Sequence, residues 1–231
     1  MAKETALIVG AGSGLSASLA RACAKEGMAV ALAARDTAKL GSVAAETGAR
    51  VYRCDAADAG AVQALFQALD DDFGALDLAV YNASYRTRGS IADLDPAEVE
   101  RSLRITAYGG FLVAQEAARR MLARGGGSIL LTGASASVKG YAQSAPFAMG
   151  KFALRGLAQS MARELAPKNI HVAHFVIDGG IRRGEVDPRG EQGADGLLDP
   201  DAIAAAYLQI HRQHRSAWTW EVELRPWTEK F

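Results

Sequence analysis

The chain has 231 residues, a length that suits one compact domain with a sizeable core. It carries 26 Lys and Arg against 26 Asp and Glu, so it has no basic surplus to attract nucleic acid or anionic lipid. We therefore expect a small-molecule partner, with no nucleic acid and no membrane. The start, Met1–Glu4, runs directly into an apolar stretch too short for a signal peptide or a membrane span. Cys23 and Cys54 lack metal or redox spacing, and two reduced thiols indicate a cytoplasmic protein.

Short apolar runs alternate with segments of helical period almost to the end of the chain. This pattern is typical of a parallel sheet with helices on both faces. We predict a Rossmann-type, doubly wound α/β fold, a three-layer sandwich with about seven strands that forms one domain over residues 1–231. The predicted strands are Thr5–Gly10, Met28–Ala33, Arg50–Arg53, Leu76–Tyr81, Ser128–Thr132, Ile170–Ile177 and Thr219–Leu224.

Three helices have clear limits in the sequence. The first runs from Gly14 to Gly27, the second from Asp95–Pro96 to about Arg124, and the third from Phe147 to Leu165, before Pro167. Residues 182–196 break the pattern, because they are rich in glycine and charge and poor in apolar side chains. We interpret this segment as a flexible loop, either a lid over a substrate site or simply disordered.

A glycine-rich turn, Gly10–Ser16, follows the first strand and opens the first helix. Glycines let the backbone approach a diphosphate closely, and the free N–H groups and helix dipole then stabilise its charge. A purely structural strand-to-helix connection would use glycines too, but a position at the start of the chain favours dinucleotide binding. Where such a motif has its third glycine there is Ser16, which is small enough for the helix to lie close to the strand. The predicted contacts are Gly10, Gly12, Ser13, Gly14 and Leu15.

The end of the second strand indicates which dinucleotide is bound. An acidic residue there would bind the ribose hydroxyls and repel a 2′-phosphate, but this chain has Ala34 followed by Arg35. We therefore predict NADP as the preferred cofactor, with NAD possible. The alternatives are that Arg35 is a solvated surface residue and that Asp36 only caps the next helix or competes for Arg35.

With these features the sequence resembles the short-chain dehydrogenase/reductase family over essentially its whole length. Cys54–Asp58 is similar to the family segment that contacts adenine, and Tyr81–Ser84 is similar to its Asn-Asn-Ala-Gly motif. Phe175–Ile181 resembles the segment that meets the nicotinamide, with Asp178 where proline is usual. The resemblance implies cofactor contacts from Asp55, Ala56, Asn82, Ala83, Lys151, Gly179 and Ile181.

The catalytic positions depart from the family pattern. The family has a tyrosine four residues before a lysine, so that both project from one face of a helix, and here Phe147 precedes Lys151. The family's serine falls on Ala134, with Ser135 next to it, and its asparagine falls on Thr106. This pattern resembles an atypical subgroup that has Phe in place of Tyr and retains the lysine.

Three hypotheses follow for the function. The chain is an oxidoreductase acting on an unidentified small carbonyl or alcohol, whose proton comes from Ser135, Tyr141, Ser144 or a water held by Lys151. Alternatively, it binds NADP(H) without turnover, as a redox-sensing or scaffold module. The third, chemistry that needs no tyrosine, is not singled out by any residue. The catalytic candidates are Lys151, Ser135 and Tyr141, although Tyr141 could equally pack at the pocket rim and Ser135 could cap a turn.

Two further expectations concern assembly and metals. The resemblance implies a homodimer or homotetramer packed through the two long helices, whose small residues allow close approach. No metal site is predicted. His171 and His174 are three residues apart on a strand and face opposite sides, and a solvated helix face is the preferred interpretation of His211 and His214.

Overall fold

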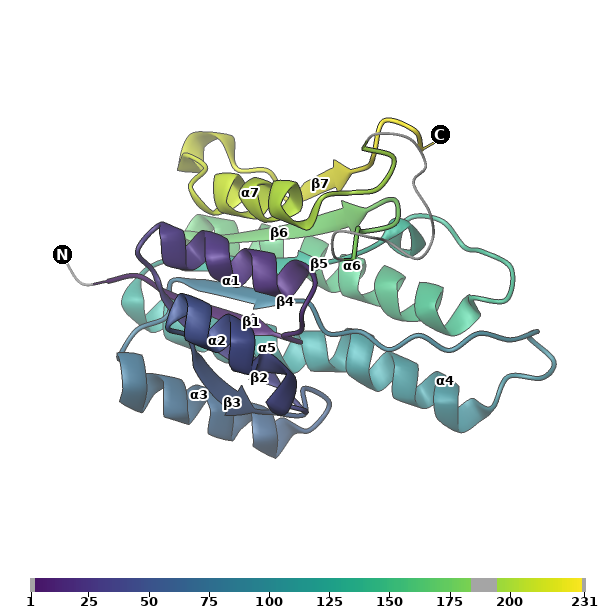
Figure 1. The fold of residues 1–231 in the computed structure, drawn as a ribbon, viewed down its shortest axis with the longest axis horizontal. Helices are drawn as coiled ribbons and strands as arrows, with labels where there is room; N and C mark the ends of the chain where they lie inside the picture. Colours follow the sequence, from purple (N-terminus) through teal and green to yellow (C-terminus); the bar gives the residue numbers. More distant parts are fainter. Residues whose placement is uncertain (1–2, 184–194, 230–231) are drawn as a thin grey trace.

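The computed structural model describes residues 3–183 and 195–229, which form a parallel sheet between two layers of helices (Figure 1). The strand order in the sheet is β3-β2-β1-β4-β5-β6-β7, and all six neighbouring pairs are parallel. The strands are β1 (Thr5–Val9), β2 (Ala29–Ala34), β3 (Arg50–Arg53), β4 (Leu78–Tyr81), β5 (Gly127–Thr132), β6 (Ile170–Ile177) and β7 (Glu221–Leu224). The predicted Rossmann-type sandwich of seven strands is confirmed.

Helices cover both faces of this sheet. The α-helices are α1 (Leu15–Lys25), α2 (Gly41–Thr47), α3 (Ala59–Phe73), α4 (Pro96–Leu103), α5 (Gly109–Arg124), α6 (Ala145–Leu165) and α7 (Pro200–His211). One core lies under α1, α2 and α7, and the other lies under α3, α5 and α6. The central strands are buried on both sides, which explains their continuous apolar sequences. None of the described helices combines the length and hydrophobicity that a bilayer span requires.

The strand order reverses between β1 and β4, and this reversal positions the site. The chain winds outward through β2 and β3 on one side and through β5, β6 and β7 on the other. In open α/β sheets, ligands bind in the crevice beyond the carboxyl ends of the strands at such a reversal. In Figure 1 this edge faces right, where the segments that follow β1, β4, β5 and β6 come together.

The predicted limits of the strands and of the first and third helices agree with the structure to within two residues. The long second helix differs, because a π-helical turn, Arg104–Tyr108, joins α4 to α5. The buried hydroxyl of Tyr81 donates a hydrogen bond to the carbonyl of Ile105 and so enters the ladder of the helix. Gly109 permits this approach, since a Cβ there would lie 2.5 Å from that hydroxyl.

The predicted loop 182–196 lies mostly outside the described residues, which omit 184–194. Its two ends are held together, because Arg182 N donates to Leu198 O and Leu198 N donates to Gly180 O, each at 2.8 Å. At the far edge of the sheet, β7 pairs with β6 alone, as expected of an edge strand.

Candidate dinucleotide and substrate clefts

The turn after β1 is built around Gly10. Its φ is +84°, and a Cβ on Gly10 would lie 2.3 Å from the backbone N of Ala83, so only glycine fits there. Gly12 and Gly14 differ, since a Cβ on either would meet no atom within 4 Å. The turn therefore packs against the segment after β4 at Gly10 and opens onto free space at the other two glycines.

Helix α1 begins at Leu15 without a side-chain cap on its first N–H groups. Ser16, at the third-glycine position, is buried, and its hydroxyl donates to Gly10 O at 3.1 Å. The same hydroxyl accepts from Asn82 Nδ2 at 2.7 Å. Ser16 therefore joins the turn to the segment after β4, a role that the sequence pattern does not indicate beyond its small size.

A first cleft of about 390 Å³ lies beside this turn, at the ends of β1, β2 and β3. Asp36 forms a salt bridge with Lys39 at 3.0 Å and accepts from Ala38 N at 3.2 Å, so it does not compete for Arg35. Within the described residues Arg35 forms no salt bridge, and it lines the cleft beside Asp55. One edge of this cleft therefore presents a guanidinium that no described acidic side chain pairs with.

A second cleft of about 590 Å³ adjoins the first and shares Asn82 and Ser84 with it. Every predicted cofactor contact and each of the three catalytic candidates lines one of the two. The first contains Gly10, Gly12, Ser13, Arg35, Asp55, Ala56, Asn82 and Ala83, and the second contains Gly14, Leu15, Ser135, Tyr141, Lys151, Gly179 and Ile181.

Lys151 is the most deeply buried charge of the second cleft, with 3% of its surface exposed. Its Nζ donates to the carbonyl oxygen of Thr132 at 2.6 Å, which ties α6 to the end of β5. Burial lowers the pKa of this ammonium from 10.5 to about 8. Lys151 is therefore a positive charge at neutral pH that can lose its proton more readily than an exposed lysine.

Phe147 lies one helical turn before Lys151 on α6, and its ring lies near two cations, one on its own helix and one on the coil after β4. The ring centre is 5.7 Å from Lys151 Nζ and 5.0 Å from the Cζ atom of Arg86. Arg86 is not among the predicted site residues. It belongs to the coil after β4, and the position of this coil beyond the carboxyl end of a central strand was the signal that could have identified it.

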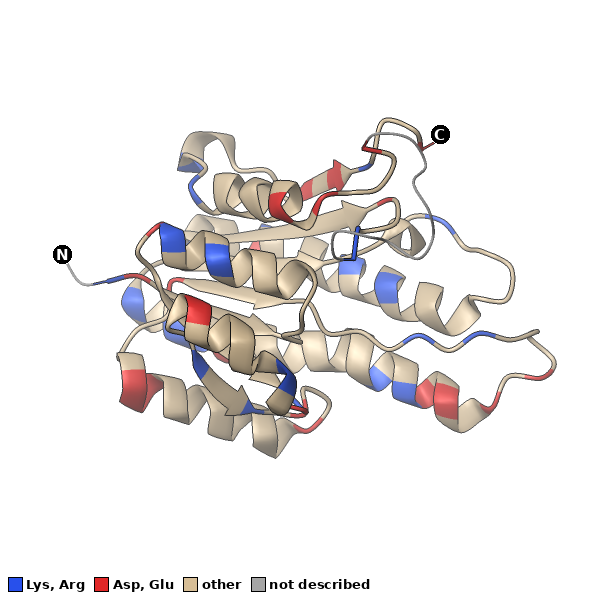
Figure 2. Cartoon of the chain, in the orientation of Figure 1, with Lys and Arg blue, Asp and Glu red and all other residues tan. Residues whose placement is uncertain are grey.

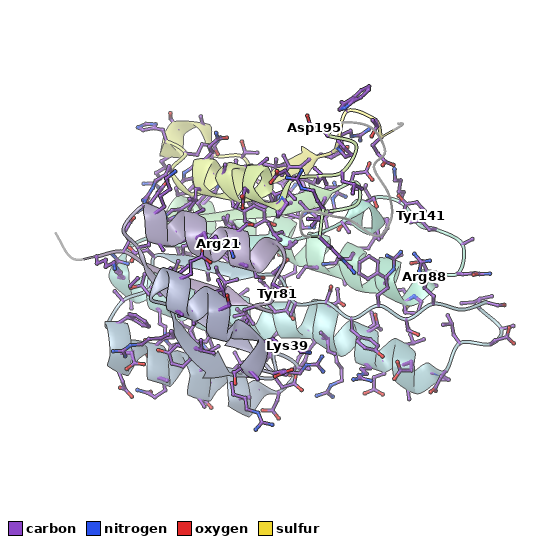
Figure 3. The ribbon with its side chains drawn as sticks, viewed as in Figure 1. Arg21, Lys39, Tyr81, Arg88, Tyr141 and Asp195 are labelled. Atoms are coloured by element: carbon purple, nitrogen blue, oxygen red, sulfur yellow. The ribbon has the colours of Figure 1, made fainter. Side chains whose placement is uncertain are left out.

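The remaining predicted positions divide into those that reach the cleft and those that do not. Ser135 and Tyr141 both line it, and Tyr141, labelled in Figure 3, is 45% exposed. Ser144 is buried, its hydroxyl has no hydrogen-bond partner, and it does not line the cleft. Thr106, at the asparagine position, is also buried away from the cleft and accepts from Tyr85 N at 3.2 Å.

A buried chain of polar contacts supports the segment that carries Ser135. Ala134 N donates to the hydroxyl of Ser137, which lies 3.1 Å away and 3.2 Å from Nε2 of His174. Nδ1 of His174 lies 3.1 Å from Glu221, whose carboxylate also binds Arg155 through two hydrogen bonds. Because a carboxylate can only accept, Nδ1 carries the proton and Nε2 accepts from Ser137. Burial lowers the pKa of His174 to about 4, so the ring is neutral.

The other histidines fit no metal site. His171 lies 2.9 Å from Thr219 O, whereas His174 contacts Ser137 and Glu221, as expected of opposite strand faces. The predicted solvated face is wrong for His211, because its side chain is largely buried and Nδ1 lies 2.9 Å from the Ser128 hydroxyl. Among the described residues no cluster of His, Cys, Asp or Glu could hold a metal ion.

Comparison with known proteins identifies relatives in sequence and in structure. Residues 4–183 match the family described as short chain dehydrogenase. A crystal structure of a short-chain dehydrogenase from Rhodopseudomonas palustris has a TM-score of 0.85 and 36% identity, covering 97% of this chain and 99% of that one. A metagenomic short-chain oxidoreductase in complex with NADP has a TM-score of 0.84 and 25% identity, covering 98% of each chain. The trans-4-hydroxycyclohexanecarboxylate dehydrogenase of Sinomonas cyclohexanicum is 33% identical over 183 residues, which are 74% of this chain and 70% of that protein.

Proposed function

This chain belongs to the short chain dehydrogenase family, and we propose that it is an oxidoreductase that uses NADP(H) to interconvert a small carbonyl compound and its alcohol. The observation that carries the proposal is the pair of adjoining clefts along the carboxyl edge of the sheet, with the uncapped start of α1 between them. An extended dinucleotide needs such a continuous path, from an adenosine site past a diphosphate site to a reaction site.

The turn after β1 fits the diphosphate of a dinucleotide. Gly12 and Gly14 face open space, in which a Cβ would occupy room that the diphosphate needs. The first N–H groups of α1 have no side-chain cap, so they and the positive end of the helix dipole are available to an anion. Gly12, Ser13, Gly14 and Leu15 would hold this group.

The edge of the first cleft favours NADP over NAD. Arg35 has no salt-bridge partner within the described residues, and Asp36 is engaged by Lys39. A 2′-phosphate on the adenosine ribose would meet Arg35, the residue that directly follows β2, whereas Asp36, the acidic group next to it in the cleft, is already paired with Lys39. The complex of the metagenomic relative with NADP supports the same preference.

The second cleft would supply the remaining chemistry. The bound coenzyme provides or accepts the hydride. Lys151, held by Thr132, would bind the nicotinamide ribose and place a positive charge beside the oxygen of the substrate, where negative charge develops during reduction. Ser135 and Tyr141 would exchange the proton, either directly or through a water held by Lys151.

We also propose that the chain represents the atypical subgroup in which Phe replaces the catalytic Tyr. Phe147, Ala134 and Thr106 occupy three of the four positions of the tetrad. The loss of a positioned general acid costs about a hundredfold to ten-thousandfold in rate, yet positioning and electrostatic stabilisation remain. The result would be a slow reductase.

The assembly and setting are part of the proposal. Residues 1–231 would fold as one domain. Large apolar side chains are exposed on the two long helices, which favours a homodimer or homotetramer packed through them; they are Tyr108, Phe111, Leu122, Met149 and Phe152. Cys23 and Cys54 are free, buried thiols, as a cytoplasmic location would require.

Thermal melting with NADPH, with NADH and without coenzyme tests the binding step. NADPH should raise the melting temperature more than NADH at equal concentration. A screen of small ketones and aldehydes, followed by the absorbance of the reduced nicotinamide, then tests turnover. Stabilisation by NADPH together with an empty screen would favour the alternative, a catalytically inactive NADP(H)-binding module with a redox-sensing or scaffold role. No stabilisation by either coenzyme would refute both.

The variant Phe147→Tyr examines the altered tetrad directly. The new phenol would lie one helical turn from the Lys151 ammonium, which lowers its pKa and prepares it to donate a proton. Turnover should rise by about tenfold or more. Phe73→Tyr, at the end of α3, adds the same hydroxyl far from the cleft and serves as control. Unchanged turnover in Phe147→Tyr, with coenzyme still bound, would favour the binding module.

A further inference from the structure

The second cleft has a marked excess of positive charge. Arg86, Lys151, Arg182 and Arg183 line it, and none of its described lining residues is Asp or Glu. The coil between β4 and α4 contributes to this excess, since residues 82–92 include two arginines and no acidic residue (Figure 2). A cleft with one sign of charge and low-dielectric walls attracts ligands of the opposite sign.

Among the described residues of this cleft, Arg86 is a cation that a substrate can use. Lys151 is bound to a carbonyl oxygen, and Arg182 forms a salt bridge with Asp199. Arg86 forms no salt bridge within the described residues. Burial, with the positive charge of Arg88 nearby, lowers the pKa of its guanidinium. The residue as a whole remains exposed, so its guanidinium is within reach of a ligand in the cleft.

Phe147 gives this guanidinium a defined position. The ring lies 5.0 Å from Arg86 Cζ, which is within the range of a cation–π contact. Gly89 N donates to Gln143 O at 3.2 Å and holds the coil of Arg86 against the loop that precedes α6. The substitution of Phe for Tyr thus replaces a proton donor by an apolar surface on which an arginine lies.

A guanidinium presents parallel N–H donors that match a carboxylate in a two-point contact. Arg86 and Lys151 lie 5.0 Å and 5.7 Å from the centre of the same ring and line the same cleft, so a molecule bound in that cleft can meet both. Its carboxylate would meet Arg86, and its carbonyl oxygen would lie toward Lys151 and Ser135. A neutral ketone would offer Arg86 no charged acceptor.

We propose that the substrate of this chain is a short oxo acid or hydroxy acid, and that Arg86 binds its carboxylate. This inference rests on the proposed oxidoreductase function and adds the substrate class to it. Arg86 would be a specificity residue that exchanges neither hydride nor proton.

The test compares pyruvate, acetoacetate and levulinate with their methyl esters, which keep the carbonyl and remove the charge. Binding is measured by calorimetry on the protein alone and on the protein saturated with oxidised NADP, with which a ketone cannot react. Turnover is measured with NADPH. Two variants are compared with the original chain: Arg86→Met, which removes the charge at the ring, and Arg88→Met, two residues further along an exposed coil (Figure 3).

At least one acid should bind about tenfold or more tightly than its ester, as expected of a hydrogen-bonded charge pair. Arg86→Met should abolish that preference, and Arg88→Met should retain it. The affinity for NADPH and the melting temperature should remain unchanged in both variants. Turnover should show the same preference in KM.

The proposal would be overturned if the acids and their esters bound equally well, or if none of the three acids bound. An equal loss in Arg88→Met, which would indicate general charge attraction, or a loss of NADPH affinity in Arg86→Met, which would assign Arg86 to the coenzyme phosphates, would also overturn it. Failure of the chain to bind any coenzyme would refute the oxidoreductase function instead. The comparison of acids with esters on the coenzyme-free protein would still decide the role of Arg86.

Discussion

Replacing the buried Lys151 by methionine should stabilise the fold at neutral pH while abolishing its activity. The ammonium is 3% exposed, and burial lowers its pKa from 10.5 to about 8. A difference of this size corresponds to roughly 3 kcal/mol of cost to the folded state at pH 7, where both folded and unfolded chains are protonated at this group. Methionine has a similar length and no charge, so it should recover much of this cost.

The loss of one hydrogen bond reduces the gain. Without Lys151, the carbonyl oxygen of Thr132 loses a donor at 2.6 Å, which costs about 1 kcal/mol at any pH. The net stabilisation expected at pH 7 is therefore about 2 kcal/mol.

The dependence on pH identifies the cause. The folded pKa lies below the unfolded one, so the unfolded chain binds more protons between about pH 8 and pH 10.5, and the original chain gains stability as pH rises through this window. By pH 9.5 the charge-related part of the difference should fall by about half. Urea unfolding of the original chain and of Lys151→Met at pH 7 and pH 9.5 measures this difference in the free energy of unfolding. A variant less stable than the original chain at pH 7, or an advantage that does not shrink at high pH, would refute the reasoning.

Three further variants test the site and its support. Gly10→Ala should destabilise the fold by more than roughly 1 to 2 kcal/mol, because φ is +84° and the new Cβ meets backbone, whereas Gly12→Ala should preserve stability in urea unfolding and weaken only coenzyme binding. Arg35→Ser should lower the affinity for NADPH by about tenfold or more and leave that for NADH nearly unchanged in calorimetry, and an equal loss for both would contradict the 2′-phosphate assignment. Glu221→Gln should cost about 1 to 3 kcal/mol at pH 7, because the neutral amide replaces the charged partner of Arg155 and the acceptor of His174. Its arginine partner holds the pKa of Glu221 below the ordinary 4.5, so this difference should disappear as acid protonates the carboxylate, and a difference that persists in acid would exclude a charge effect.

Short-range spacing was sufficient for the fold and for most of the candidate site. Strand and helix periodicity depends on neighbours along the chain, so it predicted the seven parallel strands and the limits of α1 and α6. The interval from Phe147 to Lys151 is one helical turn, which places both on one face without reference to the rest of the fold. The glycines after β1 were recognisable because a turn of this kind constrains the backbone locally.

Contacts between distant segments were decided only by the tertiary structure. The Ser16 hydroxyl links the turn to Asn82, 66 residues away, and the Tyr81 hydroxyl converts one turn of a predicted α-helix into a π-helix at Ile105. Arg86 became a candidate only when packing placed it over Phe147. Residue type and spacing along the chain do not indicate which side chain from another segment will pack against a given residue. The sequence by itself determined the fold and the edge of the sheet where the clefts form, and the packing of separate segments determined the charge inside them.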